Sequence, residues 1–249
     1  ARNILSNARV HLGQPHLLNM DLEDFFHFVT AEKVDAIFQD HFPRMRPELI
    51  ETLTRLSTRW QRLPMGAPTS PALSNWACLG LDADLETLAR YQGWNYTRFA
   101  DDMCFSGAEA IPTEAIETIR QTVHGYDFKF NEEKIQQYRE GEPRMVTGLC
   151  VTQDQIQLPA GYLDELQDEI KRLRAFKQVE YRYRTGTSRR KLKRFEQELQ
   201  GKLNFAAMVL GGAAPEVEAV AAQLETAQGA PEAFAAVSWL EIPYSFLEW

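Results

Sequence analysis

The chain has 249 residues, of which 44% are hydrophobic and 25% are charged, a composition typical of soluble globular proteins with one large domain or two modest ones. Its 27 Lys and Arg residues stand against 35 Asp and Glu, so the formal net charge of -8 argues at first against a nucleic-acid-binding protein. The sequence lacks the roughly 18 consecutive apolar residues of a membrane helix, and its three cysteines lack the spacing of a zinc site or a disulfide framework. We therefore expect a cytoplasmic protein with no membrane partner.

Apolar periodicity and turn residues predict a mixed α/β region followed by a helical one. The expected elements, in chain order, are a buried strand over 17–22, helices over 31–42 and 45–60, a turn over 63–71, a long helix over 72–91, a hairpin within 94–107, a helix over 113–124, and strands over 126–130 and 145–152. The short apolar segment 156–158 ends at Pro159. From residue 161 onward the periodicity is helical, with breaks near 185–188 and 211–215. A boundary at about Pro159 gives a mixed domain over 1–158 and a helical domain over 159–249.

Charge is distributed unevenly along the chain. Residues 171–202 contain 12 Lys or Arg and 3 Glu, a net charge of +9, whereas all other residues together have a net charge of -17. A basic amphipathic helix is often only a solvated face. Tyr181 and Tyr183 are interleaved with these cations, however, as in segments that follow a phosphate backbone. Binding of nucleic acid by this block is therefore an open alternative to a solvated surface.

Acidic residues lie where two predicted strands end. Asp101 and Asp102 occupy the expected tip of the hairpin in 94–107, and Asp21 ends the apolar run that begins at residue 17. An Asp-Asp pair in a turn is usually a solvated turn, but adjacent carboxylates between apolar strands repel each other unless a cation compensates them. Mg²⁺ prefers carboxylate and phosphate oxygens. Together the two strand ends predict a two-metal site for phosphoryl transfer.

Several blocks, in one order, resemble the conserved blocks of reverse transcriptases. They are DLEDFF (21–26), LPMGAPTSPALSN (63–75), YTRFADDMCFSG (96–107), the region of Lys134, and MVTGLCV (145–151). FADD is similar to the YxDD box of that family, with Phe99 where Tyr is commoner. The resemblance covers roughly residues 17–152. It implies an α+β right-hand polymerase, with an antiparallel sheet and helices in the palm, an all-helical thumb, and the activity of an RNA-directed DNA polymerase, a nucleotidyltransferase.

The resemblance also implies a catalytic centre. Asp21, Asp101 and Asp102 would bind two Mg²⁺ ions, and the backbone carbonyl of Leu22 would be an extra ligand. Lys134 would lie near the triphosphate as a proton donor to pyrophosphate; the alternative is an ordinary exposed lysine.

A nucleotide site follows from the same resemblance. Phe26 would lie under the sugar of the incoming deoxynucleotide and exclude a 2′-hydroxyl by steric contact. The loop against nucleotide and template would comprise Met65, Gly66, Ala67 and Ser70. Met65 departs from the family, which usually has Gln there, so this departure puts fidelity and nucleotide affinity in doubt more than activity.

Two short elements are similar to those of retron reverse transcriptases. NARVH (7–11) resembles their NAxxH element, and VTG (146–148) resembles their VTG element. The RNA contacts that this implies are Asn7, His11, Val146, Thr147 and Gly148, with a structural histidine as the alternative for His11. The cationic block fits a thumb that grips an RNA–DNA duplex by its phosphates. Its candidate contacts are Arg182, Arg184, Arg189, Arg190, Lys191, Lys193 and Arg194.

A retron-type enzyme would use a cognate structured non-coding RNA as template and primer. From dNTPs it would make an RNA–DNA hybrid (msDNA) for anti-phage defence, with a toxin or effector protein as a further partner. The basic fingers segment that normally precedes the first catalytic strand is largely absent from the sequence, so we expect truncated fingers. The alternatives are a group II intron-like, CRISPR-associated, abortive-infection or diversity-generating reverse transcriptase, and a catalytically silent RNA-binding scaffold of a defence complex.

Overall fold

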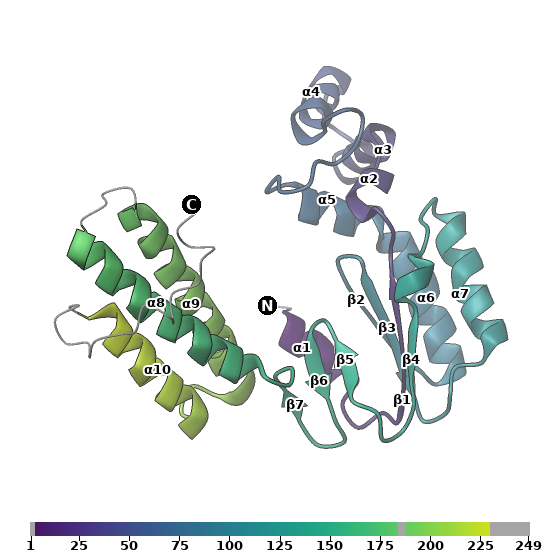
Figure 1. Ribbon diagram of the computed structural model, residues 1–249. Coiled ribbons are helices and arrows are strands. Elements are labelled where there is room, and N and C mark those ends of the chain that lie inside the picture. The colour runs from purple at the N-terminus through teal and green to yellow at the C-terminus, as the bar shows by residue number, and fades with distance from the viewer. Residues whose placement is uncertain (1–2, 184–187, 230–249) are drawn as a thin grey trace. The chain divides into compact units, whose positions relative to one another are not determined.

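The computed structural model describes residues 3–183 and 188–229 (Figure 1). The chain forms two compact units, Ala1–Gln155 and Ile156–Trp249, and each has a hydrophobic core of its own. The division lies close to the boundary expected near Pro159. The assignment of the two units as palm and thumb stays a prediction.

The first unit combines helices with two groups of strands. Its helices are α1 (Ile4–Arg9), α2 (Phe25–Phe28), α3 (Ala31–His41), α4 (Pro47–Ser57), α5 (Ser70–Ala77), α6 (Leu79–Gln92), α7 (Thr113–Gly125) and the 3-10 helix η1 (Glu132–Lys134). Its strands are β1 (His16–Asp21), β2 (Asn95–Phe99), β3 (Asp102–Gly107), β4 (Gln136–Tyr138), β5 (Arg144–Val146) and β6 (Leu149–Val151). The second unit contains β7 (Ile156–Gln157), α8 (Tyr162–Tyr183), α9 (Ser188–Leu210) and α10 (Pro215–Gln228).

A four-stranded antiparallel sheet of order β2-β3-β1-β4 organises the first unit. Figure 1 shows α6 and α7 side by side along this sheet. Two leucines of α6, Leu81 and Leu85, lie one helical turn apart and face the sheet. They are fully buried in one core with Ile119 of α7 and with Met20 and Phe105 of the sheet. This packing fixes the strand ends at which the acidic residues lie.

The second unit is a three-helix assembly. Leu166, Ile170 and Leu173 of α8 recur on one helical face and are buried with residues of the other two helices, among them Leu199 of α9 and Leu224 of α10. The helical content expected after residue 161 is confirmed over the described part. No helix in the described ranges is long and apolar enough to cross a membrane.

The hairpin expected within 94–107 is confirmed as β2 and β3, but two helices differ from expectation. The helix expected over 72–91 is interrupted at Cys78, which has φ -94° and ψ 1° between α5 and α6. The helix expected over 45–60 ends at Ser57. Trp60 and Gln61 follow it with positive φ, which a continuing helix does not allow.

Two strand assignments were also wrong, and one short strand was missed. Residues 126–130 form no strand; Asp127 has φ 60°, and Phe130 makes an isolated bridge to Leu22. The strand in this region is β4, a few residues later. The single strand expected over 145–152 is the hairpin β5–β6, because Thr147 and Gly148 both take positive φ (46° and 81°) as a two-residue type I′ turn requires.

Candidate functional site

Asp21 and Asp102 face each other at the adjoining ends of β1 and β3. The antiparallel register pairs these two residues directly, and Asp101 precedes Asp102 in the hairpin loop. The backbone N–H of Leu22 donates to the carbonyl oxygen of Asp101 at 3.0 Å, which ties the end of β1 to the loop. The structure thus brings Asp21 together with Asp101 and Asp102, which follow it in the sequence by about 80 residues.

Negative charge is concentrated at this point of the sheet. Although Asp102 keeps an exposed surface, partial burial and the charges of Asp101 and Asp21 raise the pKa of its carboxyl group to about 6. Within the described ranges, no three His, Cys, Asp or Glu side chains form a ready-made metal cluster. The donor set nevertheless fits a divalent cation, since the carboxylates of two strand ends converge here and carry more negative charge than the one neighbouring cation, Lys134, compensates.

Lys134 supplies a positive charge at the same place. Its Nζ atom lies 2.8 Å from Oδ1 of Asp21, whose side chain is 13% exposed, while that of Lys134 is 58% exposed. The hydrogen bond to Asp21 and the charge of that carboxylate raise the pKa of Lys134, so the ammonium form persists at neutral pH. The backbone N–H of Asn131 donates to the carbonyl oxygen of Asp21 at 2.8 Å, which holds the loop of Lys134 against β1.

A cavity of about 140 Å³ opens beside Asp102. Asn19, Tyr138 and Thr147 are among the residues that line it. Asn19 Oδ1 and Thr147 Oγ1 are buried without a hydrogen-bond partner among the described residues. A buried polar atom without a partner is costly, so this cavity suits water or a small polar group.

The loop before α5 is partly as expected. Met65 is 74% exposed, and Gly66 has φ 84°, a conformation that favours glycine, while Ala67 is half-buried. Ser70 is fully buried, and its Oγ donates to the carbonyl oxygen of Pro64 at 2.7 Å. The Ser70 side chain thus closes the loop internally, and the place of this loop beside a nucleotide stays a prediction.

Phe26 lies in the short helix α2, close behind Asp21 in the sequence. Its ring is half-buried and lies 5.3 Å from that of Phe25, which is fully in the core. This placement leaves part of the Phe26 ring accessible, as the proposed contact with a sugar requires.

Two residues of the retron-like elements, His11 and Val146, have buried side chains. His11 is fully buried, with Nδ1 2.7 Å from Ser106 Oγ and Nε2 2.7 Å from Thr97 Oγ1. Both ring nitrogens bind the β2–β3 hairpin inside the protein, so His11 has a structural role, and the RNA contact expected of it stays a prediction. The side chain of Val146 is buried too, and the RNA contact expected of this residue stays a prediction. Asn7 is half-buried in α1.

The turn of the β5–β6 hairpin consists of Thr147 and Gly148, which line the cavity beside Asp102. The VTG element therefore borders the candidate site. The positive φ angle of Gly148 explains why glycine occupies that position. The positive φ angle of Thr147 strains its backbone, because a β-branched residue rarely adopts this conformation.

The cationic block falls on α8 and α9. The exposed cations of the first turns of α9 are Arg189, Arg190, Lys191, Lys193 and Arg194. Arg194 pairs with Glu198 at 3.0 Å on the same helix. Arg184 lies outside the described residues, as does the side chain of Arg182.

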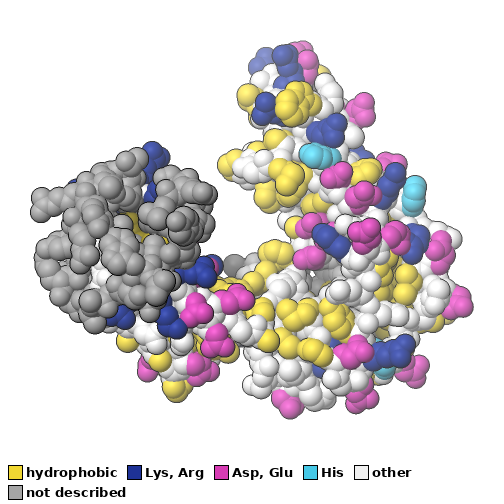
Figure 2. Space-filling model, viewed as in Figure 1, with side chains coloured by type: hydrophobic (Ala, Val, Ile, Leu, Met, Phe, Trp, Pro, Cys, Tyr) yellow, Lys and Arg dark blue, Asp and Glu magenta, His cyan; other side chains and the backbone are white. Residues whose placement is uncertain are grey.

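A second basic surface was missed by the sequence analysis. Figure 2 shows Lys and Arg side chains gathered over α4. The exposed arginines of this segment are Arg44, Arg46, Arg55, Arg59 and Arg62. Trp60 is 77% exposed beside them, and the guanidinium carbon of Arg59 lies 4.2 Å from its ring centroid. The sequence signal is five arginines within 44–62, which are spaced apart and form no continuous cationic block.

Residues 2–196 match the family described as "Reverse transcriptase (RNA-dependent DNA polymerase)". The match covers well over half of the chain. The chain belongs to the reverse transcriptase family. Reverse transcriptases generally use divalent metal ions, which agrees with the chemistry of the carboxylates at the ends of β1 and β3.

Individual reverse transcriptases are similar over much of the chain. Retron Mx162 reverse transcriptase of Myxococcus xanthus is 30% identical over 201 residues, which cover 70% of this chain and 41% of that protein. Retron Ec86 reverse transcriptase of Escherichia coli is 32% identical over 179 residues, 68% of this chain and 52% of that protein. The chain thus spans about half, or less, of the length of these relatives. The structure of a truncated apo telomerase from Candida tropicalis covers 62% of this chain and 38% of its own, at 10% identity and a TM-score of 0.44.

Proposed function

We propose that this protein is an RNA-directed DNA polymerase of retron type that works in the cytoplasm. The observation that carries the proposal is the convergence of Asp21, Asp101 and Asp102 at the adjoining ends of β1 and β3, in a chain of the reverse transcriptase family. A carboxylate set of this kind suits nucleotidyl transfer between a hydroxyl and a triphosphate.

The three carboxylates would hold two Mg²⁺ ions, with the carbonyl oxygen of Leu22 as a further ligand. Bound Mg²⁺ supplies Lewis-acid activation of the primer hydroxyl and neutralises charge on the triphosphate. Lys134, which stays protonated beside Asp21, would donate a proton to the departing pyrophosphate.

The incoming deoxynucleotide would lie between the carboxylates and the loop before α5. Phe26 would take the sugar and exclude a 2′-hydroxyl. The backbone of Gly66 and Ala67 would approach the nucleotide, with the exposed thioether of Met65 beside them.

The nucleic-acid partners would be a cognate structured RNA, as template and primer, and the RNA–DNA hybrid made from it. Arg190, Lys193 and Arg194 on the exposed face of α9 are proposed contacts for the phosphates of this hybrid. Similarity to retron reverse transcriptases supports msDNA as the product, a role in anti-phage defence, and a toxin or effector protein as partner.

The test is Mg²⁺-dependent incorporation of labelled dNTPs by the purified protein with its co-purifying RNA. We expect Asp101→Ala to abolish incorporation, and Asp154→Ala, which changes an exposed carboxylate in another loop, to leave it unchanged. An active Asp101→Ala variant would contradict the metal assignment. Tight RNA binding without incorporation of any deoxynucleotide would instead support a silent RNA-binding scaffold, and sequencing of the bound nucleic acid separates a retron from the other reverse transcriptase classes.

A further inference from the structure

The loop that carries Asp101 has an unusual backbone. The register of β2 and β3 pairs Phe99 with Asp102, so Ala100 and Asp101 form a two-residue hairpin loop. Ala100 has φ 55°, in the left-handed region. Glycine is the common residue at such a first loop position, because a Cβ atom is strained there. Something in the surrounding structure must therefore hold Ala100 in this conformation.

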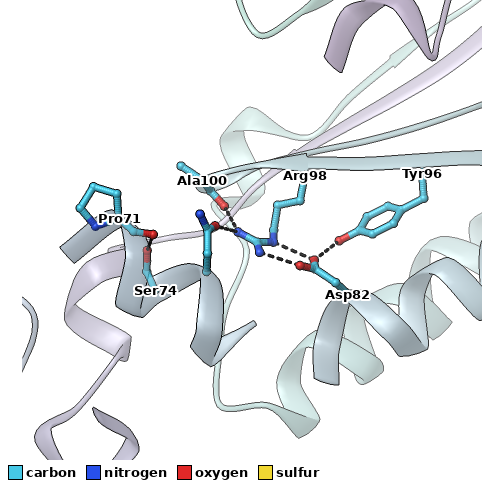
Figure 3. Close-up of polar contacts among 7 residues, drawn as sticks. Pro71, Ser74, Asp82, Tyr96, Arg98 and Ala100 are labelled. Atoms are coloured by element: carbon cyan, nitrogen blue, oxygen red, sulfur yellow. Dashed lines mark hydrogen bonds and ion pairs between the residues drawn. The ribbon is translucent and has the colours of Figure 1, made fainter. Parts of the chain in front are cut away.

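The side chain of Arg98 contacts this residue directly (Figure 3). Its Nη1 atom donates to the carbonyl oxygen of Ala100 at 2.8 Å and to Oδ1 of Asn75 at 3.1 Å. Its Nε and Nη2 atoms donate to the two carboxylate oxygens of Asp82 at 2.7 and 2.6 Å. One guanidinium group thus joins the hairpin loop to α5, through Asn75, and to α6, through Asp82.

The guanidinium group is itself held rigidly. The Arg98 side chain is 5% exposed, and the hydroxyl of Tyr96 donates to Asp82 Oδ1 at 2.9 Å. Burial alone would lower the pKa of Arg98, but the hydrogen bonds and charge of Asp82 raise it above its ordinary value. The group is therefore always charged, and a planar fork with fixed donors suits the simultaneous contacts better than an ammonium group would.

We propose that Arg98 is a positioning residue for the polymerase site. By anchoring the carbonyl oxygen of Ala100, it keeps Asp101 and Asp102 at the end of β1, opposite Asp21. This inference rests on the proposed function, in which these three carboxylates hold the metal ions. Arg98 has no contact with nucleotide or metal in this scheme and acts through the loop.

The test compares Arg98→Met and Arg98→Lys with the control Arg90→Met. Arg90 is an exposed arginine of α6 whose side chain pairs with Glu86 at 3.1 Å. For each protein we would measure folded fraction, Mn²⁺ affinity by electron paramagnetic resonance, and kcat and KM for dTTP on a poly(rA)–oligo(dT) substrate. Both Arg98 variants are expected to lose about tenfold to a hundredfold in kcat per folded molecule, with several-fold weaker Mn²⁺ binding and little change in KM. Arg90→Met should match the wild type.

A second change separates positioning from general stability. Glycine adopts the conformation of Ala100 without strain, so Ala100→Gly is expected to restore part of the kcat and of the Mn²⁺ affinity that Arg98→Met loses. Equal kcat per folded molecule and equal Mn²⁺ affinity in wild type and Arg98 variants would overturn the inference. If Arg98→Met does not fold, the same comparison is made between Arg98→Lys alone and Arg98→Lys combined with Ala100→Gly. A wild-type protein that folds but makes no DNA would overturn the proposed function instead.

Discussion

The ammonium group of Lys134 lies 2.8 Å from Oδ1 of Asp21. One proposed metal ligand is therefore already paired with a cation. A divalent ion at this carboxylate has to compete with the lysine, which the proposed reaction uses as an acid.

Lys134→Gln is expected to separate these two effects. Loss of the competing charge lowers the Mg²⁺ concentration needed for half-maximal activity, whereas loss of the proton donor lowers kcat by about a hundredfold or more. Both quantities come from Mg²⁺ titrations of dNTP incorporation, with Lys129→Gln, an exposed lysine nearby in the sequence, as the control. An unchanged kcat would rule out the acid role of Lys134.

Burial of His11 predicts a pH-dependent stability. Desolvation by burial lowers its pKa from 6.5 to about 4, so the unfolded chain binds this proton at higher pH than the fold does. The contribution of His11 to the free energy of unfolding is therefore fully present above pH 6.5. It is lost as the pH falls towards 4, and the loss amounts to at most about 3 kcal/mol.

Urea unfolding at pH 4–7.5 measures this effect. Because carboxylates also titrate in the window, the relevant quantity is the difference from His11→Gln, whose free energy of unfolding should depend less on pH. His124→Gln alters an exposed histidine of α7 and should keep the wild-type profile. Parallel profiles for wild type and His11→Gln would mean that the folded protein accommodates a charged imidazole at this position.

Opposite effects on stability are expected at the two turn residues of the β5–β6 hairpin. Thr147 has φ 46°, which Asn tolerates better than a β-branched residue, so Thr147→Asn should stabilise the first unit by about 1 kcal/mol. Gly148 has φ 81°, so Gly148→Ala should destabilise it by about 1 kcal/mol or more. Gly125→Ala, at the end of α7 with no atom near the added Cβ, is the control in thermal unfolding. A stabilising Gly148→Ala would mean that the turn changes type.

The arginines around α4 are expected to contribute to RNA binding through phosphates. Each of Arg55→Gln, Arg59→Gln and Arg62→Gln should reduce the slope of log affinity against log salt by about 0.7, the value for one contact with a single strand. Fluorescence anisotropy with a labelled RNA at several salt concentrations measures this slope. Arg90→Gln should leave it unchanged, and equal slopes for all four variants would place the RNA elsewhere.

From local sequence patterns, the helices and strands near the site could be predicted better than the surroundings of single side chains. The hairpin with Asp101 and Asp102 at its loop follows from two apolar runs around an acidic pair, and the register of β1 and β3 then places Asp21 opposite Asp102. The hydrogen-bond partners of His11 were not predictable, because Thr97 and Ser106 are some 90 residues away.

Positive φ angles account for other differences between expectation and structure. The turn at Thr147 and Gly148 and the end of α4 before Trp60 depend on backbone conformations that apolar periodicity does not report. The strand β4 was missed for a different reason: it has three residues, too few for a periodic pattern.

The exposed sulfur of Met65 makes the proposed nucleotide loop chemically vulnerable. Oxidants reach an exposed methionine before buried ones such as Met20 and Met103. The resulting sulfoxide replaces an apolar thioether by a polar group with a strong acceptor oxygen, at the position where related enzymes usually have a glutamine amide. Oxidative damage at this single side chain would therefore change the proposed nucleotide contact of the loop, while the buried core stays as it is.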